Sequence, residues 1–152
     1  MSAKATPTDA ELILKLYDLR REPELRKARN FWLGFFPESV EDFTKIGMAL
    51  GTQENAWLRQ VGGYWEMAAS LVVHGALNKE MFLEQSVSGE MFVLYAKVQP
   101  FLKELREKMQ SPAIFANVEK VITSTPEGVE RVKATQQRLA MMRKAAQAAK
   151  TA

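Results

Sequence analysis

One row of polar residues offers the chain's closest approach to a catalytic triad. Glu66, Ser70 and His74 follow one another at intervals of four, so they share one face of a helix. In a hydrolytic triad a histidine activates a serine nucleophile, and a carboxylate orients the histidine. Side chains in one helical row lean toward the helix N-terminus and cannot converge on a substrate. The Gly-x-Ser-x-Gly turn is also missing, so we predict no catalytic residues and no enzyme activity.

Metal and cofactor chemistry have less support still. The chain has no cysteine and one histidine, so thiolate sites and multi-histidine sites cannot form within it. The paired Glu-x-x-His motifs of di-iron bundles are missing, as are the glycine-rich phosphate-binding motifs. We therefore predict neither a metal nor a cofactor.

A longer polar stripe extends the same row toward Arg59, between two aromatic faces. The simplest interpretation is the solvated edge of a packed helix. The alternative is a buried pair of Arg59 and Glu66, or a small polar-lined pocket. Gly62-Gly63 fits the close approach of another backbone. The candidate pocket residues are Trp32, Trp57, Arg59, Tyr64, Trp65, Glu66 and Phe92.

These residues are expected to lie on helices, because the residues that separate the apolar segments resemble helix caps. Apolar residues recur with helical spacing, and no segment alternates with period two. The chain is therefore predicted to be all-α, a single bundle of seven to eight helices. Predicted helix starts are Thr8 with Glu11, Pro23, Ser39 with Asp42, Thr52, Asn78, Ser88-Gly89, Ser111-Pro112 and Thr125-Pro126, and predicted helix ends include Gly34, Gly51 and Gly75.

Two long antiparallel helices are predicted at the centre of the bundle. The first spans about 53–74 and is apolar on two faces, one of which carries Trp65. The second spans about 90–109. Pro100 lies inside the second helix and should kink or break it, because proline removes a backbone hydrogen bond.

The last helix, about 126–149, is basic and amphipathic. Six Lys or Arg residues stand against two Glu residues after Thr125, in a chain whose formal charge is only +3. We divide the chain into a bundle domain, 1–125, and this helix with its tail, 126–152. The spacing predicts a helix–helix seam that meets a partner chain, with a polar residue at its centre. The interface candidates are Val129, Val132, Gln136, Leu139 and Met142.

Composition places few further limits on function. Hydrophobic residues make up 47% of the chain, which is ordinary for a folded domain. The most apolar stretch, 67–77, is about half the length that would span a bilayer, and no secretory signal is evident, so we expect a cytoplasmic protein without a membrane span.

Two segments resemble a bacterial domain family of unknown function. They are Tyr-Asp-Leu-Arg-Arg-Glu-Pro-Glu-Leu-Arg-Lys-Ala-Arg at 17–29 and Tyr-Trp-Glu-Met-Ala-Ala-Ser-Leu-Val at 64–72, followed by Gly75. The resemblance covers about 12–109 and excludes the segment after Thr125. It implies a small, helical, bacterial and cytoplasmic protein, and it implies no reaction and no catalytic residues.

These observations favour a non-enzymatic interaction module that self-associates as a homo-oligomer or binds a protein partner. One alternative is a helical pocket protein that binds a small apolar or amphipathic ligand. The other is a regulator that binds an anion or nucleic acid through the basic C-terminal helix, which the small net charge makes less favourable.

Overall fold

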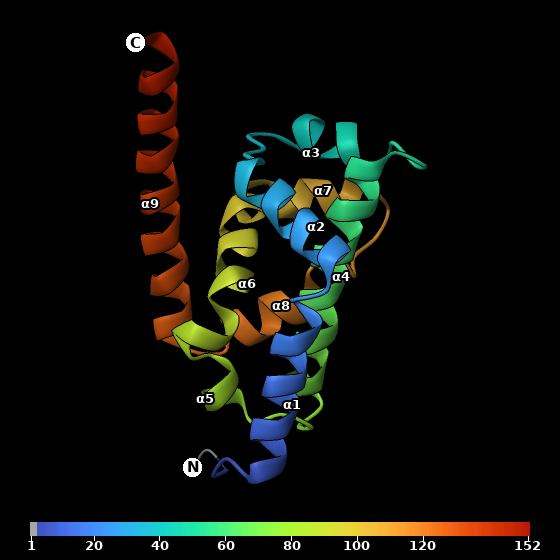
Figure 1. Ribbon diagram of the computed structural model, residues 1–152, viewed down its shortest axis with the longest axis vertical. Coiled ribbons are helices and arrows are strands. Elements are labelled where there is room, and N and C mark those ends of the chain that lie inside the picture. The colour runs from blue at the N-terminus through green and yellow to red at the C-terminus, as the bar shows by residue number, and fades with distance from the viewer. Residues whose placement is uncertain (1–2) are drawn as a thin grey trace.

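The computed structural model describes residues 3–152, and all regular structure in this range is helical (Figure 1). The predicted all-α class is therefore confirmed. The elements are α1 (Pro7–Leu19), α2 (Pro23–Gly34), α3 (Val40–Gly47), α4 (Gln53–Val73), α5 (Lys79–Phe82), α6 (Gln85–Val98), the 3-10 turn η1 (Gln99–Phe101), α7 (Leu102–Lys108), α8 (Ala116–Ile122) and α9 (Pro126–Thr151).

Helix α4 is the central helix, as its two apolar faces predict. It contacts α2, α3 and α8. Val61, Trp65 and Ala68 are almost completely buried along its length. Gly75 follows the helix with a φ of +73°, a left-handed conformation that glycine adopts without steric cost, so the predicted end near His74 is confirmed.

The predicted second long helix is interrupted. Helix α6 runs antiparallel to α4 (Figure 1), but it ends at Val98, and η1 separates it from α7. Pro100 lies within η1, where its missing N–H breaks the α-helical hydrogen-bond series. Helix α6 begins at Gln85, earlier than predicted. Its backbone is non-helical at Ser88 (φ −114°, ψ 15°), so a second helical run starts at the predicted position, Ser88-Gly89.

Local capping chemistry sets most helix starts. The side chains of Ser39, Thr52, Asn78 and Thr125 each accept a hydrogen bond from a backbone N–H three residues later, so these four predicted starts are confirmed. The predicted cap Thr8 is wrong. Thr6 forms the capping box of α1 with a carboxylate three residues later, which places Pro7 at the first helical position.

Two other predicted boundaries are wrong. Helix α3 ends at Gly47, and Gly51 instead lies in the connection to α4 with a φ of +89°. Helix α8 begins at Ala116 rather than at Ser111-Pro112, because a turn occupies the intervening residues. This turn ends at Phe115, a non-glycine residue with a φ of +53°.

Helix α9 lies along α6 and extends past the rest of the bundle (Figure 1). Val132 and Thr135 are buried near its start, whereas residues 144–152 are exposed throughout. The turn that leads into α9 is tight at Gly128, where a Cβ atom would lie 2.0 Å from the carbonyl oxygen of Ile122. Only glycine fits there without a shift of the backbone. Between residues 3 and 152, none of these helices is both long and apolar enough to cross a membrane.

Candidate ligand-binding pockets

The row Glu66, Ser70 and His74 does not form a triad, because each side chain bonds to the backbone. The two carboxylate oxygens of Glu66 accept from the amides of Asn117 (2.8 Å) and Val118 (3.1 Å) at the start of α8. The Ser70 hydroxyl donates to a carbonyl one turn earlier, and His74 Nδ1 lies 2.8 Å from the Ser70 carbonyl. Glu66 thus caps α8, where the helix dipole favours a negative charge.

The remaining members of the polar stripe are solvated or contact other groups. Arg59 is exposed and donates to the side-chain oxygen of Asn55 at 2.9 Å. Its exposure agrees with the solvated edge that was the simplest interpretation, and the alternative ion pair with Glu66 does not form. A Cβ atom on Gly62 would lie 3.6 Å from the ring of Phe115, and one on Gly63 would meet open space, so the predicted approach of another backbone is also wrong.

The structure does not gather the predicted pocket residues around one cavity. Tyr64 and Trp65 line one pocket, and Trp32, Arg59 and Glu66 line another. Trp57 is half-buried against Phe31, with ring centres 6.0 Å apart. Phe92 is buried beneath Arg131, whose guanidinium lies 3.7 Å from the centre of its ring.

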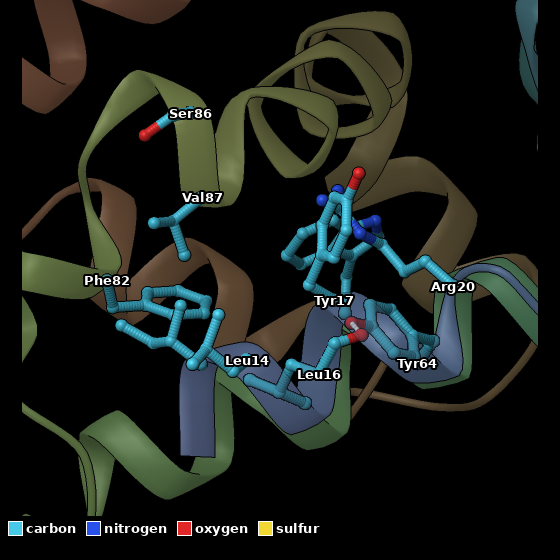
Figure 2. A pocket seen from close by; sticks show the side chains of 10 residues that line it. Leu14, Leu16, Tyr17, Arg20, Tyr64, Phe82, Ser86 and Val87 are labelled. Carbon is cyan, nitrogen blue, oxygen red and sulfur yellow. Dashed lines mark hydrogen bonds between the residues drawn. The ribbon is translucent and has the colours of Figure 1, made fainter. Parts of the chain in front are cut away.

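The first cavity, which we call the α1 pocket, has a volume of about 260 Å³. Its walls come from α1, α4, α5 and the first turn of α6, and they are almost entirely apolar. Figure 2 shows Val87 pointing toward Leu14 and Phe82 across the pocket, with Tyr17 and Arg20 at the opposite end. The lining residues are Ile13, Leu14, Leu16, Tyr17, Arg20, Tyr64, Trp65, Phe82, Ser86 and Val87.

Hydrogen bonds and an ion pair hold the inner wall of the α1 pocket. The Trp65 indole N–H donates to Glu90 at 2.9 Å, and the other oxygen of Glu90 pairs with Arg29 at 2.6 Å. The Tyr64 hydroxyl donates to the carbonyl of Leu16, which ties α4 to α1. Burial raises the pKa of Tyr64 to about 12, so this hydroxyl stays protonated and keeps its donor at neutral pH.

The second cavity, which we call the α8 pocket, has a volume of about 290 Å³ and is also mainly apolar. It lies between α4 and the turn before α8, and its lining residues include Trp32, Gly62, Ile114 and Phe115. Phe115 is held in a left-handed conformation that bulky residues rarely adopt. Sequence patterns gave no signal for this turn, because Ser111-Pro112 has the form of a helix start.

A buried lysine was also not predicted. The ammonium of Lys97 on α6 donates to the carbonyl of Trp32 and lies 4.2 Å from the centre of the Phe36 ring. The side chain therefore binds the C-terminal end of α2, where the helix dipole favours a positive charge. Burial lowers the pKa of Lys97 to about 8.

The five interface candidates divide between two environments. Val132 and Leu139 pack against the bundle core of their own chain, and Gln136 donates to Ala96 O (3.2 Å) and Gln99 Oε1 (3.0 Å). Val129 and Met142 are exposed. The buried part of the seam predicted for a partner chain therefore attaches α9 to α6 of the same chain.

The family described as a domain of unknown function, DUF4760, matches residues 5–125. The chain belongs to this family. The match extends beyond the predicted 12–109 at both ends and stops one residue before α9 begins at Pro126. No curated protein and no solved structure matches the chain.

Proposed function

We propose that this DUF4760 member is a non-enzymatic binding module whose α1 pocket takes the apolar part of a small amphipathic ligand. The observation that carries the proposal is an open cavity of about 260 Å³ with almost entirely apolar walls. An engineered cavity of roughly 150 Å³ lined by similar side chains is large enough to bind benzene. The α1 pocket has room for a ligand larger than benzene.

The surroundings of the pocket also support binding. Leu14 is 67% exposed and Tyr17 is 55% exposed at the pocket mouth, although both are large apolar side chains. Each side chain would lose water contact when a ligand enters, which favours binding through the hydrophobic effect. Trp65, at the back, is only 1% exposed and fixed by Glu90, so the wall is formed before a ligand arrives.

A pocket-filling substitution tests the proposal. Val87 is half-buried and points into the α1 pocket, so Val87→Phe should occupy ligand space. Val73→Phe is the matched control, because Val73 is exposed at the end of α4 and lines none of the described pockets. We expect decanoate, measured by titration calorimetry, to bind the unsubstituted protein and Val73→Phe equally, and to bind Val87→Phe at least tenfold more weakly. Equal affinity for all three proteins would contradict the assignment of this pocket.

Association with a second copy or another protein remains a separate proposal. It is supported by Met141 and Met142 on α9, large apolar side chains that are 70% and 59% exposed. The basic charge of α9 also permits an acidic or nucleic-acid partner. We further propose that the protein acts in the bacterial cytoplasm, on the basis of its lack of cysteine and the resemblance described above.

A further inference from the structure

We propose that the α1 pocket selects amphiphiles with a carboxylate head group, and that Arg20 is the cation that binds this carboxylate. The inference rests on the proposed function and specifies its ligand class. Binding of a carboxylate in this way needs a cation at the pocket mouth, contacts that hold this cation in place, and no carboxylate of the protein that already pairs with it.

Arg20 is at the end of α1 and lines the pocket. Its guanidinium lies 5.4 Å from the ring centre of Tyr17 and 5.4 Å from that of Trp65. Attraction between a cation and aromatic faces holds the group in place, so less side-chain freedom is lost when a ligand binds. Figure 2 shows the Arg20 side chain reaching past Tyr17 at the end of the pocket opposite Val87.

The charge of Arg20 is not neutralised by an ion pair. Within residues 3–152, no carboxylate lies within 4.0 Å of its guanidinium. Glu90, whose charge also acts on Tyr64, is already engaged by Arg29 at 2.6 Å and by the Trp65 indole at 2.9 Å. A positive group thus remains available beside an apolar cavity, which is the arrangement that an amphiphilic anion requires.

The geometry favours a carboxylate over other head groups. A guanidinium presents two parallel N–H donors that match the two oxygens of a carboxylate. One free cation balances one negative charge, whereas a phosphate monoester carries close to two charges at neutral pH. An amine head group would be repelled by Arg20. We therefore expect a single-chain carboxylic acid, with its apolar chain directed toward Val87 and Phe82.

The test compares ligands that share one apolar chain. Decanoate, 1-decanol, decylamine and decyl phosphate are titrated calorimetrically into the full chain and into Arg20→Gln and Arg20→Lys. Arg21→Gln is the control, because it removes the same charge from the neighbouring position. The Arg21 side chain is exposed and does not line the pocket. Thermal unfolding of every variant checks that it folds.

We expect the unsubstituted protein and Arg21→Gln to bind decanoate at least tenfold more tightly than 1-decanol, a difference of about 1.4 kcal/mol. Arg20→Gln should bind the two ligands equally. Arg20→Lys should keep part of the preference, because it retains the charge but loses the paired donors. If Arg20→Gln does not fold, the comparison of decanoate with 1-decanol in the unsubstituted protein and in Arg20→Lys still decides the question.

The same titrations distinguish a failure of the proposed function from a failure of the carboxylate assignment. If neither decanoate nor 1-decanol binds, the proposed function itself is contradicted. If both bind with equal affinity to the unsubstituted protein, the pocket is real and only the carboxylate selection is overturned. Tighter binding of decyl phosphate than of decanoate, or of decylamine than of 1-decanol, would also overturn the carboxylate assignment.

Discussion

Removal of the Trp65 side chain should be among the most destabilising changes in the chain. Trp65 is 1% exposed, packs edge-on against Tyr64 with ring centres 5.0 Å apart, and lies 6.3 Å from the Phe82 ring. Substitution of a buried tryptophan by alanine costs about 3–5 kcal/mol, because apolar contacts are lost and a cavity remains. Trp65→Ala also leaves one oxygen of Glu90 without its indole donor, which adds to the loss.

Urea denaturation followed by far-ultraviolet circular dichroism, which reports helix content, measures this cost. With a denaturant slope of about 2 kcal/mol per molar, the unfolding midpoint should fall by about 2 M. Trp57→Ala is the matched control, since Trp57 is only half-buried, and its midpoint should fall by less than half as much. Trp65→Phe should fall between the two, because it keeps an aromatic ring but loses the indole hydrogen bond. Equal midpoints for Trp65→Ala and Trp57→Ala would refute the placement of Trp65 in the core.

Four further outcomes are expected. The Lys97 pKa of about 8 lies below that of a lysine in the unfolded chain, so unfolding takes up a proton between pH 8 and about 10.5. The free energy of unfolding therefore rises with pH in this range. Lys97→Met should lose this rise, as measured by urea midpoints across the same range. Glu66→Gln should lower the thermal midpoint, because it weakens the cap of α8. His74→Ala should leave unchanged any turnover that a broad ester and phosphoester screen detects. If α9 mediates self-association, light scattering should give a smaller mass for a chain that ends at Ala140 than for the full chain, and equal monomer masses would contradict this proposal.

Features encoded by neighbouring residues were predictable from the sequence. Caps such as Ser39 and Thr125 satisfy orphan backbone donors three residues away, so the signal is contained in a few positions. The error at Thr8 shows the limit of this signal, because Thr6 and Thr8 each precede an acidic residue by three positions. The geometry favours Thr6, since that choice puts Pro7 where no N–H is needed.

The pockets depend on contacts between distant segments and were not predictable in detail. Helical spacing shows that Tyr64 and Trp65 face the core, but it does not show that Tyr64 meets Leu16, 48 positions earlier. The same spacing identified an apolar seam on α9 without showing that α6 occupies its buried part. Periodicity defines which face of a helix is apolar, and the partner of that face is set by tertiary packing.

Nuclear magnetic resonance of the three tryptophan indole N–H groups would show directly whether a ligand enters the α1 pocket. Trp65 lines the α1 pocket, Trp32 lines the α8 pocket and Trp57 lines neither, so each indole signal reports on a different place. When decanoate is added to the ¹⁵N-labelled full chain, we expect the Trp65 signal to shift in a saturable manner while the Trp32 and Trp57 signals stay in place. A shift of the Trp32 signal without that of Trp65, or no saturable shift at all, would contradict ligand binding in the α1 pocket.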